Sequence, residues 1–519
     1  MRTRTITTLL AAVVVALAGP LPAAGSLDGT VKLGNVWLEK EDGDRSAVQE
    51  TYNVHDGFAI SQVRLDGRNP RHAFSLDLRD INLDSRQGDF VYRAPGIFKL
   101  TAGYDQSRYV FDPARLTNSE RKDLRLGAML TTGRWFSLSG SFGRLERTGD
   151  RLVFPAGPVS PLLGTGYDNV LLAGHVGAEI RGDRRGLAFA YRVSDYSDDR
   201  NAENDRLGHL VSGRLWLPTP SFDRWTHMLR AAYGERRQTD RSLDYELAQF
   251  QYTSILDPME RVQLKYNFEA QRIDHQGTGL KTDRFQNDLD LVLGHAYGRV
   301  TAGYGYEMND DDRSLTHYNS FRAGATFRYE RRISAKLDFA SRTKTDTEEL
   351  TLLKDVESSR IRGTLQLEPV DGFALGGRYA KRERELPDID VKFDGEVMGG
   401  FGRCEVAKWG SLSADYNYAT DEYTDLAAGY EVSSHIVTGR AEITRFRNLR
   451  LAGGATYMDI GRDLDIEKSM VFGEAAYRFL KDYQLEVRYN VYNYDDYILL
   501  DRYYTANVIR VNLAYDLHL

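Results

Sequence analysis

Apolar and polar residues alternate without a break from Val508 to Leu519 at the end of the chain. Because side chains on a β-strand point alternately to its two faces, one face of this segment is expected to be apolar. The residues on that face are Ile509, Val511, Leu513, Tyr515, Leu517 and Leu519. The opposite face carries Arg510, Asn512, Asp516 and His518. The segment is predicted to be a strand with one apolar and one charged face.

The same two-sided pattern recurs along the whole chain. A soluble sandwich would hide its apolar face and would rarely carry Lys, Arg and Glu at so many inner positions. The pattern therefore predicts an all-β fold, a large transmembrane antiparallel up-and-down β-barrel. Its apolar side chains would face lipid, and its charged side chains would face an aqueous interior.

Alternating runs and turn signals place 26 strands along the chain. They lie near residues 29–40, 57–66, 71–80, 88–94, 97–110, 123–132, 135–146, 169–181, 186–197, 207–217, 226–238, 243–256, 260–273, 284–295, 298–309, 317–330, 333–345, 355–368, 372–384, 392–407, 410–423, 430–446, 448–461, 465–480, 483–496 and 500–518. The connections after even-numbered strands are short, and the others are mostly longer and rich in acidic residues. In outer-membrane barrels the short turns are periplasmic, so an even strand count predicts that both termini are periplasmic.

The amino terminus has the features of a secretory signal. Arg2 and Arg4 precede an apolar run, residues 9–18, and small residues follow at 22–25. We expect residues 1–24 to be a signal peptide and residues 25–519 to form the barrel, in the outer membrane of a Gram-negative-type envelope. The formal net charge of −7 becomes −9 without the two arginines, and an acidic balance argues against nucleic-acid binding.

Alternation also predicts which side chains enter the lumen. In one strand Val262, Leu264, Tyr266, Phe268 and Ala270 would face lipid, and Tyr483, Leu485, Val487, Tyr489 and Val491 would do so in another. The intervening residues would face the lumen. Candidate contact residues for a partner in the lumen are Lys265, Glu269, Glu486, Arg488 and Arg510.

Tyrosine is abundant, with 31 residues, and much of it lies near strand ends. Examples are Tyr416, Tyr418, Tyr492, Tyr494, Tyr503 and Tyr504. Amphipathic aromatic rings gather at the two lipid–water boundaries of barrels, so we expect these residues to form aromatic girdles.

Candidate chemistry is sparse. A single cysteine, Cys404, excludes an intrachain disulfide, covalent c-type haem and a thiolate zinc site, and we expect it to be a small packed residue. His175, His209, His227, His295 and His435 are scattered and match no metal motif. We therefore expect no catalytic site, metal site or cofactor in this chain, although a rim of acidic loops leaves a surface-loop enzyme as an alternative.

Two charged runs have ordinary explanations. The run from Asp310 to Asp312 lacks the glycine and terminal glutamate of a calcium loop, so a solvated acidic loop tip is favoured. Arg184, Arg185, Arg331 and Arg332 lie in predicted periplasmic turns. Turn chemistry is favoured there over capture of an acidic partner.

The segment from Phe74 to Asp112 resembles the MtrB/PioB family of decahaem-associated outer-membrane proteins. The matching residues are Leu83, Asp84, Ser85, Arg86, Gly96, Tyr104 and Asp105. The similarity covers about 40 residues. Two features depart from the family: the chain is shorter than typical members, and the Cys-x-x-Cys found near the start of some members is absent.

The resemblance implies a function that alternation alone does not. The barrel would sheath and insulate a periplasmic multihaem c-type cytochrome in its lumen, within an electron conduit across the outer membrane. A cell-surface cytochrome is a further implied partner, and the partner would carry all the haem. The main alternative is a porin or diffusion channel for small solutes, whose pore the connection from Glu146 to Asp168 would constrict.

Overall fold

The computed structural model describes residues 25–44, 56–110, 117–153, 162–220, 222–239, 243–312, 314–347, 355–406, 408–424, 429–497 and 503–518. The strands are β1 (Ser26–Gly43), β2 (Gly57–Arg68), β3 (Ala73–Arg79), β4 (Arg86–Ala94), β5 (Phe98–Val110), β6 (Asn118–Thr132), β7 (Phe136–Val153), β8 (Leu162–Arg181), β9 (Gly186–Asp198), β10 (Arg206–Thr219), β11 (Phe222–Gln238), β12 (Tyr245–Met259), β13 (Val262–His275), β14 (Lys281–His295), β15 (Gly298–Asp310), β16 (Leu315–Tyr329), β17 (Ile333–Asp346), β18 (Val356–Val370), β19 (Phe373–Leu386), β20 (Val391–Val406), β21 (Gly410–Thr424), β22 (Gly429–Phe446), β23 (Leu449–Arg462), β24 (Ile466–Leu480), β25 (Tyr483–Asp496) and β26 (Tyr504–His518). Within these described ranges, two short 3-10 helices, η2 (Ala202–Asn204) and η4 (Pro387–Ile389), lie in connections.

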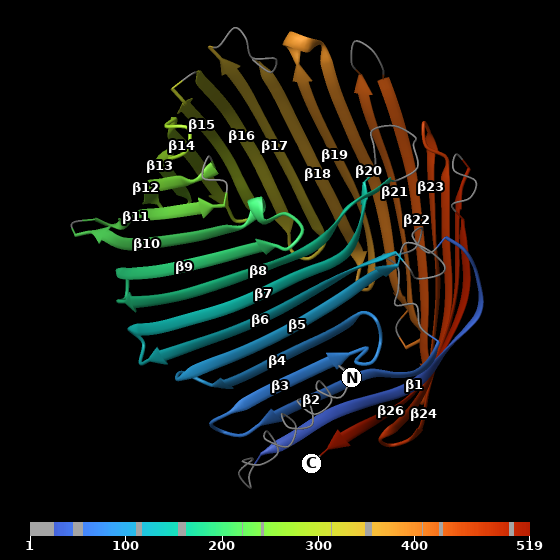
Figure 1. Ribbon diagram of the computed structural model, residues 1–519. Helices are drawn as coiled ribbons and strands as arrows, with labels where there is room; N and C mark the ends of the chain where they lie inside the picture. Colours follow the sequence, from blue (N-terminus) through green and yellow to red (C-terminus); the bar gives the residue numbers. More distant parts are fainter. Residues whose placement is uncertain are drawn as a thin grey trace.

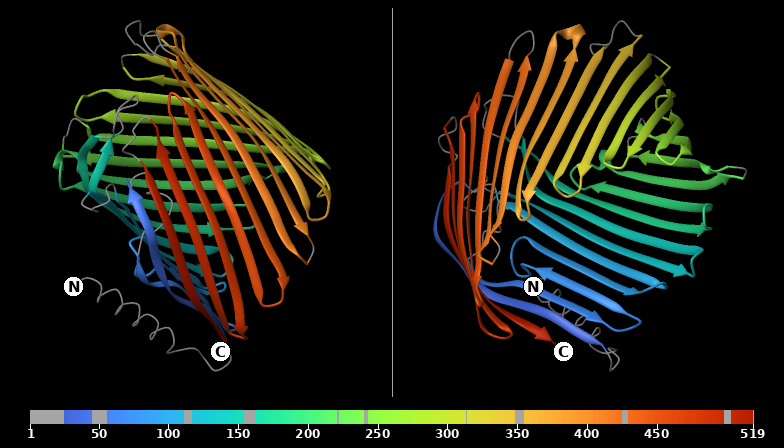
Figure 2. Two further views of the ribbon diagram at one scale, coloured as in Figure 1. Left: turned by 90° about the vertical axis from the view of Figure 1, so that its right-hand side faces the viewer. Right: turned by 180° about the vertical axis from the view of Figure 1, so that it is seen from behind.

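Each strand pairs antiparallel with the next, and the last strand pairs with the first (Figure 1). The closing register runs from Asp28 opposite His518 to Gly43 opposite Tyr504. Both views in Figure 2 show β1 and β26, blue and red, side by side. Closure leaves no unpaired strand edge, which is how a sheet satisfies its backbone in lipid. The predicted count of 26 strands and the barrel architecture are therefore confirmed.

The predicted alternation of connections is also confirmed. Those after even-numbered strands span two to four residues, whereas the others span three to 13. Short connections share one end of the barrel with the start of β1 and the end of β26, as the closing register requires. No helix in the described part of the chain is long and apolar enough to cross a membrane. The predicted signal peptide, residues 1–24, lies outside the described residues.

Both flanks of one predicted loop are instead part of the wall. In the alternative interpretation as a porin, the connection from Glu146 to Asp168 would constrict the pore, but β7 continues to Val153 and β8 begins at Leu162. Within this hairpin Glu146 pairs with Val170, and Thr148 pairs with Asp168. The backbone ladder continues through polar residues such as Thr148 and Asp168, which do not alternate with apolar ones. Residues 154–161 lie outside the described part of the structure.

The outer face of the barrel is apolar. In β13–β16 the directly opposed residues Tyr266, Leu289, Tyr304 and Phe321 form one row, and all four are among the exposed large hydrophobic residues. Val262, Leu264, Phe268 and Ala270 share their face, as predicted. An apolar surface that runs from strand to strand around a protein is suited to acyl chains rather than water.

The packed core of the molecule lies on the inner face of the wall, beside the seam between β1 and β26. Its buried members are Val36, Ala59, Leu83, Tyr492, Tyr494, Tyr504, Ala506 and Val508, and Leu38, Ile466 and Met470 pack against it. We call this group the seam cluster. The prediction that Tyr492, Tyr494 and Tyr504 belong to an aromatic girdle is wrong. They share the inner face with Glu486 and Asn512, and Tyr504 has no exposed surface.

Candidate functional site: the inner wall of the barrel

The inner wall is polar and carries charges of both signs. Its character is clear in a row of directly opposed residues that crosses β13–β16, namely Lys265, Asp290, Gly303 and Arg322. This row is offset by one residue from the apolar row of the outer face. An Arg322 amino group lies 3.1 Å from Asp290 Oδ1 and 3.0 Å from Asp288 Oδ1. The surface that faces the lumen therefore satisfies many of its charges by pairing between strands.

The five predicted contact residues lie on this inner face, in two separate places. Lys265 and Glu269 of β13 line a depression of about 320 Å³ together with inner residues of β11, β12 and β14. Glu269 accepts a hydrogen bond of 2.9 Å from the side chain of Gln249. Glu486, Arg488 and Arg510 lie on β25 and β26. The five residues therefore do not form one site.

The residues on β25 and β26 have structural partners. Glu486 pairs with Lys32 Nζ at 2.8 Å, and Arg510 lies 3.6 Å from Asp80. Arg488 donates to Asn490 at 3.0 Å, and its guanidinium lies over the ring of Phe472. These side chains join strands to one another, which makes them contributors to the wall.

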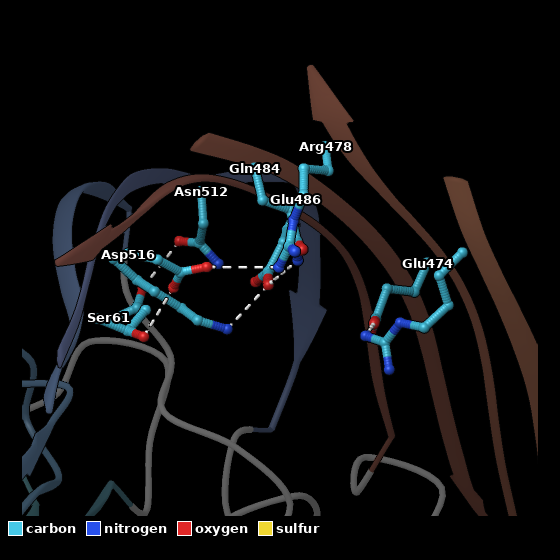
Figure 3. Close-up of polar contacts among 10 residues, drawn as sticks. Ser61, Glu474, Arg478, Gln484, Glu486, Asn512 and Asp516 are labelled. Carbon is cyan, nitrogen blue, oxygen red and sulfur yellow. Dashed lines mark hydrogen bonds and ion pairs between the residues drawn. The ribbon is translucent and has the colours of Figure 1, made fainter. Parts of the chain in front are cut away.

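Figure 3 shows the polar network that continues across the seam. Ser61 donates to Asn512 and Thr30 donates to Asp516, each at 2.8 Å. Asp516 also pairs with Arg478 at 3.4 Å. Ser61 reaches Asn512 because a bulge in the β1–β2 register adds an extra residue at this point of β2. These contacts fasten the last strands to the first two.

The segment that carries the family resemblance lies next to the seam cluster. Residues 80–82 run beside β2, where the amides of Asp80 and Ile81 donate to Ser61 and Ile60. Leu83 then enters the seam cluster, and 1% of its surface is exposed. This segment therefore continues the wall where β3 ends early.

The other motif residues surround this turn. Asp84 lies 3.7 Å from Arg108, whose amide donates to Ser85 Oγ at 3.5 Å. The Tyr104 hydroxyl donates to Gln106 at 2.7 Å. Arg86 pairs in register with Gln106, and Asp105 pairs with Asp123. All of these contacts lie within the wall, so the motif has a structural role in this barrel.

The histidines are mostly partners of tyrosines. A tyrosine hydroxyl lies 2.7 to 3.2 Å from a histidine Nδ1 in five pairs. These pairs are Tyr92–His72, Tyr191–His209, Tyr252–His227, Tyr306–His317 and Tyr416–His435. Most sit on the outer face, where each ring supplies a hydrogen-bond partner that lipid cannot. Among the described residues, no group of three or more His, Cys, Asp or Glu side chains is arranged to hold a metal ion.

The remaining polar candidates serve local structure. Asp311 Oδ1 accepts from the amide of Ser314, and Asp312 Oδ2 accepts from the amide of Lys281, so the acidic run closes a turn. Arg184 pairs with Asp223 at 3.1 Å, and Arg332 donates to the carbonyl of Pro369 at 2.9 Å. Cys404 is half-buried on the outer face, between Phe373 and Leu412 of the neighbouring strands.

The inner face of β18 and β19 carries a band of arginines that alternation within single strands does not bring together. The band consists of Arg360, Arg362, Arg378, Arg382 and Arg384, all exposed. Arg360 lies directly opposite Arg382 in the register, although like charges in that position destabilise a sheet. In the described part of the protein, Arg360, Arg362 and Arg384 form no ion pair with an acidic side chain. Arg382 and Arg378 pair with Asp421 and Asp415, so only part of the band is neutralised. The remaining positive charges favour an anionic group in the lumen.

Comparison with known proteins supports the fold. The chain is similar to the siderophore receptor PirA from Acinetobacter baumannii, with 7% identity and a TM-score of 0.52 over 95% of this chain and 80% of the receptor. The fold is that of an outer-membrane β-barrel. The siderophore receptor PirA from Pseudomonas aeruginosa is also similar, with 12% identity and a TM-score of 0.49 over 95% of this chain and 80% of the receptor. The FrpB iron transporter from Neisseria meningitidis has 10% identity and a TM-score of 0.48 over 94% of this chain and 81% of the transporter. No protein-family model and no curated protein matches the sequence.

Proposed function

We propose that this barrel is a sleeve that encloses and insulates a periplasmic multihaem c-type cytochrome. Electrons would pass along the partner's haems across the outer membrane, as the resemblance to the MtrB/PioB family implies. A cell-surface cytochrome would receive or supply them at the far end. The barrel itself would hold no cofactor and catalyse no reaction.

The observation that carries the proposal is a wide bore with a charged wall. The described residues form strands, two 3-10 helices and connections, and none of them forms a folded domain within the 26-stranded wall. Barrels of 22 strands already enclose a folded plug, so this one has room for a protein. Hydrocarbon cannot solvate the polar surface of a cytochrome, whereas a polar inner wall can contact it.

Co-purification tests the proposal. The barrel, tagged and isolated from its own organism in mild detergent, should retain haem-staining protein in a fixed ratio to barrel. The same barrel produced in a host without multihaem cytochromes should lack haem and should conduct ions in a planar bilayer. A barrel that is haem-free from its own organism and conducts small solutes would instead be a diffusion channel, the main alternative function.

The orientation that the proposal requires can be tested separately. The short connections should lie in the periplasm and the long ones outside the cell. Single cysteines can be introduced into a Cys404→Ala background at Asp371, in a connection after an even-numbered strand, and at Asp388, in a connection after an odd-numbered strand and so at the other end of the barrel; both positions are exposed. An impermeant maleimide should label only the Asp388→Cys variant on intact cells and both variants after lysis. The reverse labelling pattern on intact cells would show that the barrel has the opposite orientation in the membrane.

A further inference from the structure

A groove of about 1080 Å³ lies on the inner wall between β4 and β12. It differs from the surface of β13–β16, where many charges are paired between strands. Its floor follows a row of directly opposed small residues, Gly143, Ala173, Ser194 and Gly208, on β7–β10. Arg125 and Arg236 stand at the two ends of this row. The groove is deep at this row because four neighbouring strands have glycine or another small residue at directly opposed positions.

Three arginines line the groove next to this row of small residues. Arg192 of β9, Arg206 of β10 and Arg236 of β11 all line the groove. The guanidinium of Arg206 lies 4.6 Å from the ring centre of Tyr196, and that of Arg236 lies 5.7 Å from the ring centre of Tyr245. The aromatic rings hold these guanidiniums in place without neutralising them.

The charges of these arginines are not neutralised by direct ion pairs. Within the described ranges, none of the three forms an ion pair, and Arg236 Nε is buried without a hydrogen-bond partner. Between β7 and β11 the inner residues that line the groove include no carboxylate. Asp89 lies at the far end beside Arg125, and Glu235 is on the outer face, where it pairs with Arg237.

We propose that this groove is a binding site for a ligand with two or more anionic groups, carboxylates or phosphates. Register places Arg206 and Arg236 about 7 Å apart at their backbones, and Arg192 and Arg236 about 12 Å apart, from standard strand spacings. A guanidinium binds either group through two parallel hydrogen bonds, and the volume matches a site for a small molecule or an extended peptide segment. The ligand is therefore a free polyanion or an acidic segment of a protein in the lumen.

Titration calorimetry with inorganic tripolyphosphate tests the site on barrel produced without any cytochrome. The test variant is Arg192→Gln/Arg206→Gln/Arg236→Gln. The matched control, Arg230→Gln/Arg299→Gln/Arg328→Gln, removes the same charge from inner positions outside the groove. We expect the dissociation constant to rise at least tenfold in the test variant and less than twofold in the control. Equal changes in the two variants, or no binding to the wild-type barrel, would overturn the proposal.

The same probe distinguishes the two sources of the anionic groups. Barrel isolated from its own organism is titrated before and after its lumen is emptied with high salt. Tripolyphosphate binding that appears only after the salt wash assigns the groove to an acidic protein segment, whereas equal binding before and after assigns it to a free polyanion. Because the first titration uses barrel alone, it does not depend on whether the occupant carries haem.

Discussion

Arg382 of β19 forms an ion pair with Asp421 of β21, a strand that is not its neighbour in the sheet, with 2.9 Å between Nη2 and Oδ1. The intervening strand presents Gly395 at the position opposite both residues. A Cβ atom there would lie 2.7 Å from Arg382 Nε and from Asp421 Oδ1. The missing side chain therefore opens the path along which the guanidinium crosses β20.

Substitution of Gly395 by alanine is expected to block this crossing. The ion pair is largely exposed, so its loss should lower the free energy of unfolding by about 0.2–1 kcal/mol. In an Asp421→Asn background the same substitution should cost less, because the pair is already broken. Urea unfolding of the four variants measures this coupling. Gly439→Ala, where an added Cβ meets no atom within 4 Å, is the matched control; a loss as large in the control would contradict the explanation.

Leu83→Ala tests the seam cluster. The side chain is almost fully buried against Val36 and Tyr504, so its truncation should leave a cavity and lower the free energy of unfolding by about 2–5 kcal/mol. The urea midpoint in detergent micelles reports the change. Leu243→Ala, at a half-exposed position in a connection, should change the midpoint little. Equal effects of the two substitutions would show that Leu83 does not anchor the cluster.

The strand count could be predicted from sequence because lipid imposes alternation on every strand of a barrel. Tight turns then separate the runs, as at Gly96 and Gly133, whose positive φ angles suit glycine. The extensions of β7 and β8 could not be predicted because residues such as Arg147, Gly149 and Asp150 interrupt the apolar alternation there. Alternation reveals a strand only where one of its faces must be apolar. A strand that continues without an apolar face cannot be predicted from this pattern.

The functional features of the inner wall were harder to predict. The parity of β25 places Tyr492 and Tyr494 on the same face as Glu486, so the sequence of this strand does contain the signal that both rings face inward. The groove gives no such signal. Arg192 and Arg236 lie 44 positions apart, and only the register of three strands brings them to one floor. Contacts between strands depend on register, which alternation within single strands does not specify.

The pair of His227 and Tyr252 on the outer face provides a test of polar groups in lipid. The Tyr252 hydroxyl lies 2.8 Å from His227 Nδ1, and Thr219 Oγ1 lies 2.9 Å from Nε2. Tyr252→Phe should leave a ring nitrogen without a partner and cost about 1–3 kcal/mol of unfolding free energy. His227→Phe/Tyr252→Phe should recover much of that loss, as urea unfolding in lipid vesicles can measure.

A control shows whether the tyrosine hydroxyl matters only when it has a partner. Tyr477 is also exposed on the outer face, and its hydroxyl forms no hydrogen bond with the described residues. Tyr477→Phe should leave the unfolding free energy unchanged. If Tyr477→Phe costs as much as Tyr252→Phe, the loss comes from the hydroxyl itself and the pairing is irrelevant.

Asp80, in the connection between β3 and β4, should make the stability of the barrel depend on pH. Burial raises the pKa of this carboxyl above its ordinary value of 3.8, and Arg510 offsets only part of the increase. The folded barrel therefore holds the proton more tightly than the unfolded chain. The contribution of Asp80 to stability is complete below pH 3.8 and is lost as the pH rises through the raised pKa. Asp80→Asn, which keeps an uncharged side chain, should raise the urea midpoint at pH 7.5 but not at pH 3.5. A lower midpoint for the variant at pH 7.5 would mean that the attraction of Arg510 exceeds the cost of burial.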